Sequence, residues 1–93
     1  MLLAVETANF GFWIRDIARN AIWASEQWRE LFAFEKSERL EFERILQRVH
    51  SDDREAVRYA MAKALADCGE YETEYRVVLP EGRLRWIAAR GRV

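Results

Sequence analysis

The hydrophobic side chains between residues 57 and 79 change their spacing from that of a helix to that of a strand, which constrains the fold strongly. The first set repeats every three or four residues, as on a helix of four turns with one buried face. Its members are Val57, Ala60, Met61, Ala64, Leu65 and Cys68. The second set alternates with other residues, as on a strand. Its members are Tyr71, Thr73, Tyr75, Val77 and Leu79. Gly69 lies between the two sets, where a left-handed glycine would end the helix.

A hairpin follows the change of period. Pro80-Glu81-Gly82 is a tight turn, because proline fixes its first position and glycine accepts a left-handed one. Residues 84–93 are expected to return as the partner strand. The apolar residues of this strand fall on both faces, which predicts a sheet covered on both sides. They are Leu84, Trp86 and Ala88 on one face and Ile87, Ala89 and Val93 on the other.

The first half of the chain predicts a hairpin and two further helices. Residues 11–17 and 21–24 are the hairpin strands, and Ser25 is expected to cap the next helix. Two apolar sets at helical spacing mark the helices: Trp28, Leu31 and Phe32, then Phe42, Ile45, Leu46 and Val49. Residues 1–9 carry a weak helical pattern and are interpreted as a short capping helix. The order helix, hairpin, helices, hairpin predicts an α+β fold with a four-stranded antiparallel sheet and helices on one face.

The bulk properties exclude several classes of protein. The 93 residues suffice for one small domain, taken as residues 1–93. A net charge of −1 argues against a nucleic-acid partner, because phosphate binding needs a basic excess. Cys68 is the single cysteine, so no internal disulfide forms, which fits a reducing compartment. No apolar run predicts membrane insertion by this segment, and residues 1–6 do not resemble a signal peptide, so we expect a cytoplasmic location, although the parent protein could be membrane-anchored.

Six short motifs follow one another along the chain: Gly11-Phe12-Trp13-Ile14-Arg15-Asp16, Leu31-Phe32, Val49-His50-Ser51-Asp52-Asp53-Arg54, Glu74-Tyr75-Arg76, Pro80-Glu81-Gly82 and Arg85-Trp86-Ile87. In this order they resemble the PAS family, in particular the PAS domains of bacterial sensor kinases and related regulators. Ser51 stands where the family usually has proline. The family fold has five strands, and its last strand is absent after the final hairpin strand. We therefore expect four strands here and an exposed edge that invites pairing.

The resemblance gives seven residues structural roles. They are Asp16, His50, Asp52, Asp53, Arg54, Gly82 and Trp86. His50, Ser51 and Asp52 also suggest a catalytic triad, but neighbours in sequence rarely converge on one atom, so we interpret them as a helix start. Ser51 or Asp52 would cap that helix, with Glu55 completing a capping box. Arg54 is expected to pair with a carboxylate. Further strand-end ion pairs are expected for Asp16, Arg76, Arg85 and Arg90.

The resemblance also places a small ligand cavity between the sheet and the middle helices. The expected lining of this cavity is Phe42, Leu46, Met61, Tyr75 and Val77. The cofactor is unknown. Flavin is disfavoured because no Asn-Cys-Arg-Phe-Leu type motif is present, and Cys68 is interpreted as a core residue. Haem is disfavoured because His50, the single histidine, lies at a helix junction. No metal site is expected.

The sequence therefore supports two candidate functions. The first is a sensory module of a bacterial signalling protein, such as a two-component system, that binds a small-molecule ligand and relays a change to an output domain of the same chain. That output would be a histidine kinase, a cyclase or a regulator of transcription. The alternative is a ligand-free PAS module for dimerisation or docking. A homodimer is expected in either case. We do not expect enzymatic activity, because the sequence has no phosphate-binding loop, no cluster of residues with metal-ligand spacing and no nucleophile elbow.

Overall fold

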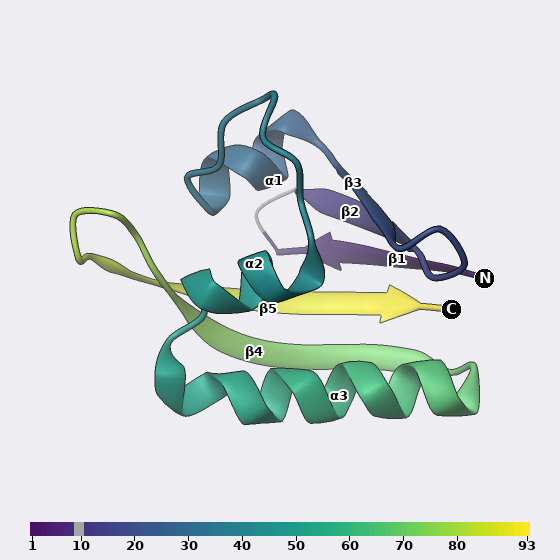
Figure 1. The fold of residues 1–93 in the computed structure, drawn as a ribbon. Coiled ribbons are helices and arrows are strands. Elements are labelled where there is room, and N and C mark those ends of the chain that lie inside the picture. Colours follow the sequence, from purple (N-terminus) through teal and green to yellow (C-terminus); the bar gives the residue numbers. More distant parts are fainter. Residues whose placement is uncertain (9–10) are drawn as a thin grey trace.

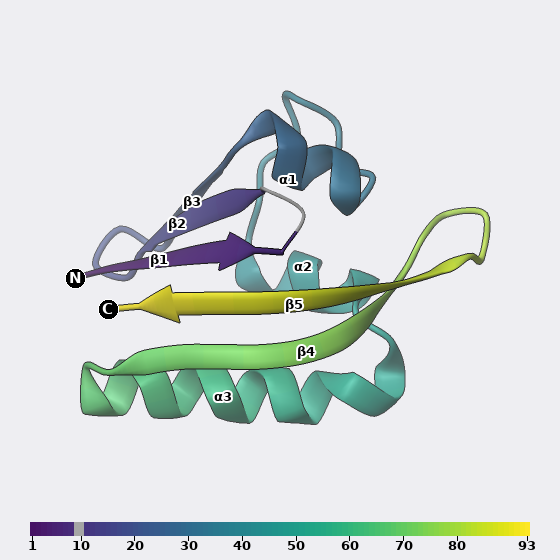
Figure 2. The same ribbon diagram turned by 180° about the vertical axis from the view of Figure 1, so that it is seen from behind.

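The computed structural model describes residues 1–8 and 11–93 as one antiparallel sheet of five strands with the helices on one face (Figures 1 and 2). The strands lie in the order β3-β2-β1-β5-β4. Their bounds are β1 Leu2–Thr7, β2 Phe12–Asp16, β3 Ala21–Ala24, β4 Glu70–Val78 and β5 Leu84–Arg92. The α+β class and the two hairpins are confirmed. No helix among the described residues has the length and apolar character needed to cross a membrane.

The prediction of four strands is wrong, and so is that of a helix over residues 1–8; residue 9, which the predicted helix included, lies outside the described residues. Residues 2–7 form the central strand, β1, which pairs with β2 on one side and β5 on the other. Leu3, Val5 and Thr7 are buried, whereas the residues between them are exposed, so this segment has the period of a strand. Because β1 lies between the two hairpins, the sheet has five strands in place of the expected four, and its edges are β3 and β4.

The helices begin and end close to the predicted positions, but their caps differ. The helices are α1 Glu26–Leu31, α2 Phe42–Arg48 and α3 Arg54–Asp67, with a single 3-10 turn, η1 Ser51–Asp53, before α3. The Ser25 cap is confirmed, since its Oγ accepts the backbone N–H of Trp28 at 3.2 Å. Capping by Ser51 or Asp52 is wrong, because His50 Nδ1 accepts the Asp52 backbone N–H at 3.1 Å. Cys68 ends α3 itself with a φ of 49°, in place of Gly69, and its side chain is exposed and not in the core.

The β4–β5 hairpin is the longest ladder of the sheet and is joined by the predicted turn. Gly82 has a φ of 88°, the left-handed conformation that the turn requires. Nine residue pairs connect the strands, from Glu70 with Arg92 to Val78 with Leu84. Inward-facing residues of these strands, such as Tyr75 and Ile87, are buried under the helices.

The sheet is covered on one face only, so the prediction of a sheet covered on both faces is wrong. Leu84 and Trp86 of β5 are exposed, whereas Ile87 and Ala89 of the same strand are buried. All the helices lie on the side of the sheet that carries the buried residues, so none covers the other face (Figures 1 and 2). The strand pattern alone gives the two faces but not the number of covering layers.

Replacing Gly91 by alanine is expected to lower the free energy of unfolding by about 1–3 kcal/mol, a range typical of an overpacked interior. A Cβ at this position would lie 2.5 Å from the Ala4 carbonyl oxygen and 2.7 Å from Val5 Cγ2, both on β1. The measurement is urea unfolding followed by circular dichroism. Gly69→Ala is the matched control, since its Cβ would approach Asp67 Cβ no closer than 3.6 Å. Equal stability of the two variants would contradict the close approach of β1 and β5.

Candidate functional site

An ion pair between Asp53 and Arg76 joins the start of α3 to β4. Asp53 Oδ2 accepts the backbone N–H of Arg76 at 2.8 Å and its Nε–H at 2.9 Å, and Asp53 Oδ1 accepts from Nη2 at 2.8 Å. The Arg76 guanidinium also lies 5.4 Å from the ring centroid of Trp86 on β5. These contacts form a continuous series that runs from the helical layer through β4 to the uncovered face of the sheet. We call Asp53, Arg76 and Trp86 the junction.

The residues before α3 also contact β4 through backbone groups. The His50 N–H donates to the Arg76 carbonyl at 2.8 Å, and Val49 forms a β-bridge with Val77. Arg54 donates to the carbonyls of Val49 and Gln47, at 3.0 and 3.2 Å, so the predicted carboxylate partner is wrong. His50 Nδ1 and the Asp53 carboxylate are thus engaged in structural hydrogen bonds, and the helix-start interpretation holds.

Replacing Asp53 by asparagine is expected to change how stability depends on pH. Hydrogen bonds from the Arg76 side chain and then from its backbone lower the pKa of Asp53 from 3.8 to about 2. Because the folded-state pKa is depressed, this carboxylate stabilises the fold fully above about pH 4, and the contribution is lost as the pH falls towards 2. Thermal unfolding from pH 6 to pH 2 should show wild type and Asp53→Asn converging in that window. A difference that stays constant across it would contradict the ion pair, and Asp52→Asn, on an exposed carboxylate, is the control.

Four of the five residues of the predicted cavity lie in the core. Leu46, Met61, Tyr75 and Val77 are buried, and Trp28, at 0% exposure, is buried with them. Burial, and then the neighbouring Tyr71, raises the pKa of Tyr75 well above its usual value, so its hydroxyl stays protonated. Phe42 is half-buried at the margin of the core. A ligand at these five residues would have to displace packed side chains, so their assignment as a lining stays a prediction.

An aromatic cluster occupies the core between β2, α1 and β4. Trp28 stacks on Phe32 with ring centroids 4.0 Å apart, and the Trp13 and Trp28 centroids are 6.4 Å apart. Three nitrogen donors in this region are buried and have no hydrogen-bond partner among the described residues: Trp13 Nε1, Trp28 Nε1 and Arg15 Nε. An unpaired buried donor is destabilising, so three such donors in one small domain are uncommon.

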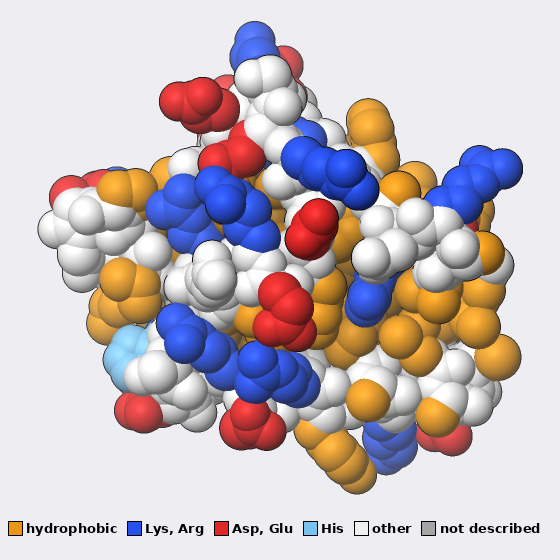
Figure 3. Space-filling model, in the orientation of Figure 1, with side chains coloured by type: hydrophobic (Ala, Val, Ile, Leu, Met, Phe, Trp, Pro, Cys, Tyr) orange, Lys and Arg blue, Asp and Glu red, His pale blue; other side chains and the backbone are white. Residues whose placement is uncertain are grey.

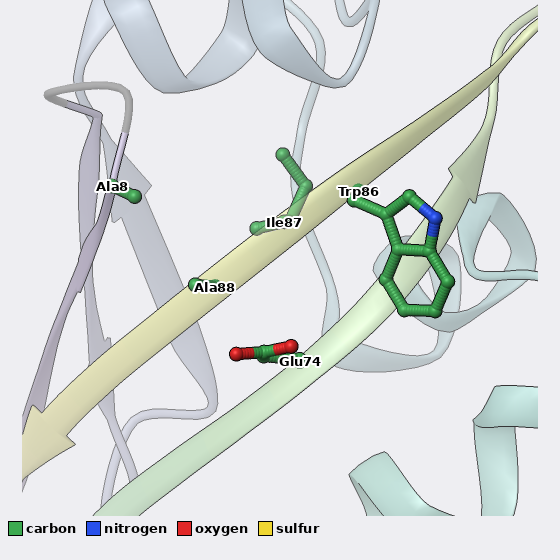
Figure 4. A pocket seen from close by; sticks show the side chains of 5 residues that line it. All are labelled: Ala8, Glu74, Trp86, Ile87 and Ala88. Atoms are coloured by element: carbon green, nitrogen blue, oxygen red, sulfur yellow. The ribbon is translucent and has the colours of Figure 1, made fainter.

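The uncovered face of the sheet carries large apolar side chains. We call this set the open face: Leu2 on β1, Phe12 on β2, Trp23 on β3, and Leu84 and Trp86 on β5, all exposed. Trp23 and Trp86 are 56% and 64% exposed, and Trp23 lies 5.3 Å from Phe12 between ring centroids. Beside Trp86 lies an open depression of about 230 Å³ lined by Ala8, Glu74, Trp86, Ile87 and Ala88 (Figure 4). Sequence reasoning gave Trp86 a structural role and assigned no site to this face.

Residues 21–93 match the family model described as the PAS fold. The chain belongs to the PAS fold family. Its curated relatives include a blue-light-activated histidine kinase of Brucella anthropi, 30% identical over 88 residues, and proteins of the same name from Brucella ovis and Brucella abortus, each 35% identical over 89 residues. Each match covers 95% of this chain but 18% of the relative, so the chain spans less than a fifth of those proteins.

The remaining motif residues of this PAS domain hold its loops and strand ends. Asp16 lies 3.8 Å from Arg19, and Arg90 lies 3.8 Å from Glu72, so both form exposed ion pairs. Arg85 is different, since its Nη1 donates to the Leu31 carbonyl at 2.7 Å and so binds α1 to β5. Within residues 1–8 and 11–93, no group of histidine, cysteine and carboxylate side chains is arranged to hold a metal ion.

Proposed function

We propose that this PAS domain is the signal-sensing module of a bacterial signalling protein and that its open face binds a second copy of the domain. The observation that carries the proposal is the set of five exposed apolar side chains on one side of the sheet. Large exposed apolar patches mark interaction surfaces in soluble proteins. The relatives' printed name, histidine kinase, supports an output domain of that class in the same protein.

The charges beside the open face favour a second copy as the occupant. Acidic residues of β4 lie next to basic residues of β5 on the same side of the sheet, and they pair as Glu70 with Arg92 and Glu72 with Arg90. In a two-fold interface the same patch meets itself. A patch with adjoining acidic and basic rows is complementary to itself when the second copy runs in the opposite direction.

The junction would carry a change from the helices to this interface. Asp53 lies at the start of α3, and Arg76 contacts both its carboxylate and the Trp86 ring. A shift of α3 would therefore alter the position of Arg76 and the packing of Trp86 on the open face. A signal biases such a module only through its different affinity for two arrangements.

Replacing Trp86 by glutamate tests the interface. We expect sedimentation equilibrium to show the wild-type chain as a dimer and the Trp86→Glu variant shifted towards monomer at least about tenfold in dissociation constant, the loss of an aromatic hot spot. Tyr59→Glu is the matched control, because Tyr59 is an aromatic residue of α3 that is 70% exposed but lies on a helix. A monomeric wild type, or equal dissociation constants for both variants, would overturn the docking surface.

Sensing of a small ligand in the interior is a second candidate. The three unpartnered donors near β2 support it, because a bound acceptor would satisfy them. Mass spectrometry of small molecules extracted from the purified chain tests it. A stoichiometric compound that is absent after denaturation and refolding in clean buffer would support ligand sensing.

A further inference from the structure

The backbone of β4 points hydrogen-bonding groups away from the sheet. β4 is the last strand of the sheet, next to β5. The Arg76 N–H donates to Asp53 Oδ2 at 2.8 Å, and the Arg76 carbonyl accepts the His50 N–H at 2.8 Å. Both backbone groups of Arg76 therefore point away from β5. Every second residue of an antiparallel ladder has the same orientation, so this pattern extends along β4.

Three residues at the start of β4 share the orientation of Arg76. The backbone N–H and C=O groups of Glu70, Glu72 and Glu74 point outward, and they have no hydrogen-bond partner among the described residues. Unpaired groups along a strand edge are a template for an added strand. The outer edge of β4 is thus occupied at Arg76 and free over residues 70–74.

A groove of about 460 Å³ lies between this free edge and α3. Its lining is Ala56, Tyr59, Ala60 and Lys63 of α3 with Glu70, Glu72 and Thr73 of β4. α3 lies beside β4 in both ribbon views (Figures 1 and 2). Over α3, at the bottom of the space-filling view, exposed hydrophobic side chains lie next to charged ones (Figure 3). Because two of the lining residues are alanines, the groove has room for side chains of an added strand.

The charges beside the free edge indicate what kind of strand would fit. The side chains of Glu70, Glu72 and Glu74 are exposed on the uncovered side of the sheet. From α3, the groove is lined by one cation, Lys63. Residues directly across from each other on neighbouring strands point to the same side, and opposite charges there are favourable. An added strand would therefore carry basic residues opposite the glutamates and apolar residues between them, facing the groove.

A second copy of the domain does not suit this edge. Two antiparallel β4 strands would set one row of glutamates against another, and like charges directly opposite each other are destabilising. Glu74 adds to this effect, because it lies opposite Ala88 of β5 and forms no ion pair among the described residues. The charge pattern therefore favours a different chain with basic residues.

We propose that the outer edge of β4 binds an extended basic segment of another protein as an additional strand. The segment alternates lysine or arginine with small apolar residues. Its backbone bonds to the outward groups of Glu70, Glu72 and Glu74, and its apolar side chains lie in the groove beside Tyr59, which is 70% exposed. This surface is the edge of the sheet, whereas the open face is its uncovered side.

Amide hydrogen exchange tests the free edge and then its occupant. In the free chain, the amides of Glu72 and Glu74 should exchange at least about tenfold faster than those of Tyr71 and Thr73, which face β5. The probe is a seven-residue peptide with blocked ends in which lysine and valine alternate. At saturation, this peptide should slow the exchange of the Glu72 and Glu74 amides at least about tenfold.

Replacing Glu74 by lysine should weaken binding of this peptide at least about threefold, because an attraction becomes a repulsion. Glu81→Lys is the matched control, since Glu81 is an exposed glutamate in the turn beyond β4. Trp23→Glu, on the open face at the opposite edge of the sheet, should bind the peptide as wild type does. That result would separate this edge from the open face.

Two methylated peptides test whether the backbone forms the contact. Methyl groups on the lysine backbone nitrogens remove donors that face β4 and should abolish binding, whereas methyl groups on the valine nitrogens point away and should be tolerated. The proposal is overturned if these two peptides bind equally, if glutamate can replace lysine in the peptide, or if the peptide leaves the exchange of Glu72 and Glu74 unchanged. Protection of these amides in the free chain, whether constant or rising with protein concentration, would also overturn it.

Discussion

Replacing Val5 by aspartate is expected to leave the chain unfolded at neutral pH. Val5 is completely buried at the centre of the sheet, with Trp13 of β2 and Gly91 of β5 as its cross-strand partners. Neither direct partner carries a charge, and Arg15 lies only diagonally across from Val5. Burial of an unpaired charge is penalised by several kcal/mol or more. A domain of this size has about 5–15 kcal/mol of stability in total. Far-ultraviolet circular dichroism during a urea titration should show no cooperative transition.

The same substitution one residue earlier is the control for this result. Ala4 is on the same strand but faces the uncovered side of the sheet, where its side chain is exposed. Ala4→Asp should therefore keep the cooperative transition. If Val5→Asp unfolds at the same urea concentration as Ala4→Asp, β1 is not the central strand.

Replacing Trp28 by alanine should lower the free energy of unfolding by about 3–5 kcal/mol, the range found for large aromatic residues in cores. Trp28 is fully buried and contacts Trp13, Phe32 and Phe34 through its ring. Alanine would leave a cavity in the centre of the aromatic cluster, and the rings around it cannot all collapse onto the space. Urea unfolding with linear extrapolation gives the free energy.

Trp86→Ala is the matched comparison, because it removes the same side chain from a surface. Trp86 is 64% exposed, so the loss should be within about 0.5 kcal/mol for the monomer. The measurement is made at a protein concentration below the dimer dissociation constant. Similar losses for the two variants would mean that Trp28 is not the centre of the core.

The sequence predicted most elements of the fold because their patterns are local. The stripe on α3, the alternation on β4 and the Gly82 turn each depend on residues that are close in sequence. The Ser25 cap is equally local, since its partner is three residues away. The PAS resemblance added the order of these elements.

The sequence did not predict β1, because its partners are remote. Leu2, Leu3 and Val5 suit a short helix as well as a strand, and Thr7, a polar residue, hides the alternation. The choice is made by β2 and β5, which offer a buried place between them, and β5 lies more than eighty residues away in the chain. Tertiary context decides such ambiguous segments.

The candidate site was only partly predictable for a similar reason. Asp53 and Arg76 belong to recognisable motifs, but nothing in the sequence pairs them across 23 residues. The place of Arg15 could have been predicted from the sequence. It follows Trp13 by two residues on a strand, so an inward-facing tryptophan implies an inward-facing arginine. The open face needed the structure, because strand alternation does not say whether a second layer covers the sheet.

The place of β1 also sets how the molecule would respond to tension. Its first residues lie beside the last residues of β5, with Ala4 opposite Arg92, so the two ends of the described chain emerge side by side (Figures 1 and 2). Pulling these ends apart would load the hydrogen bonds between the two strands one after another, in unzipping geometry and not in shear. Tension on the ends would thus split the sheet down its middle, between its two hairpins, before it reached the helices.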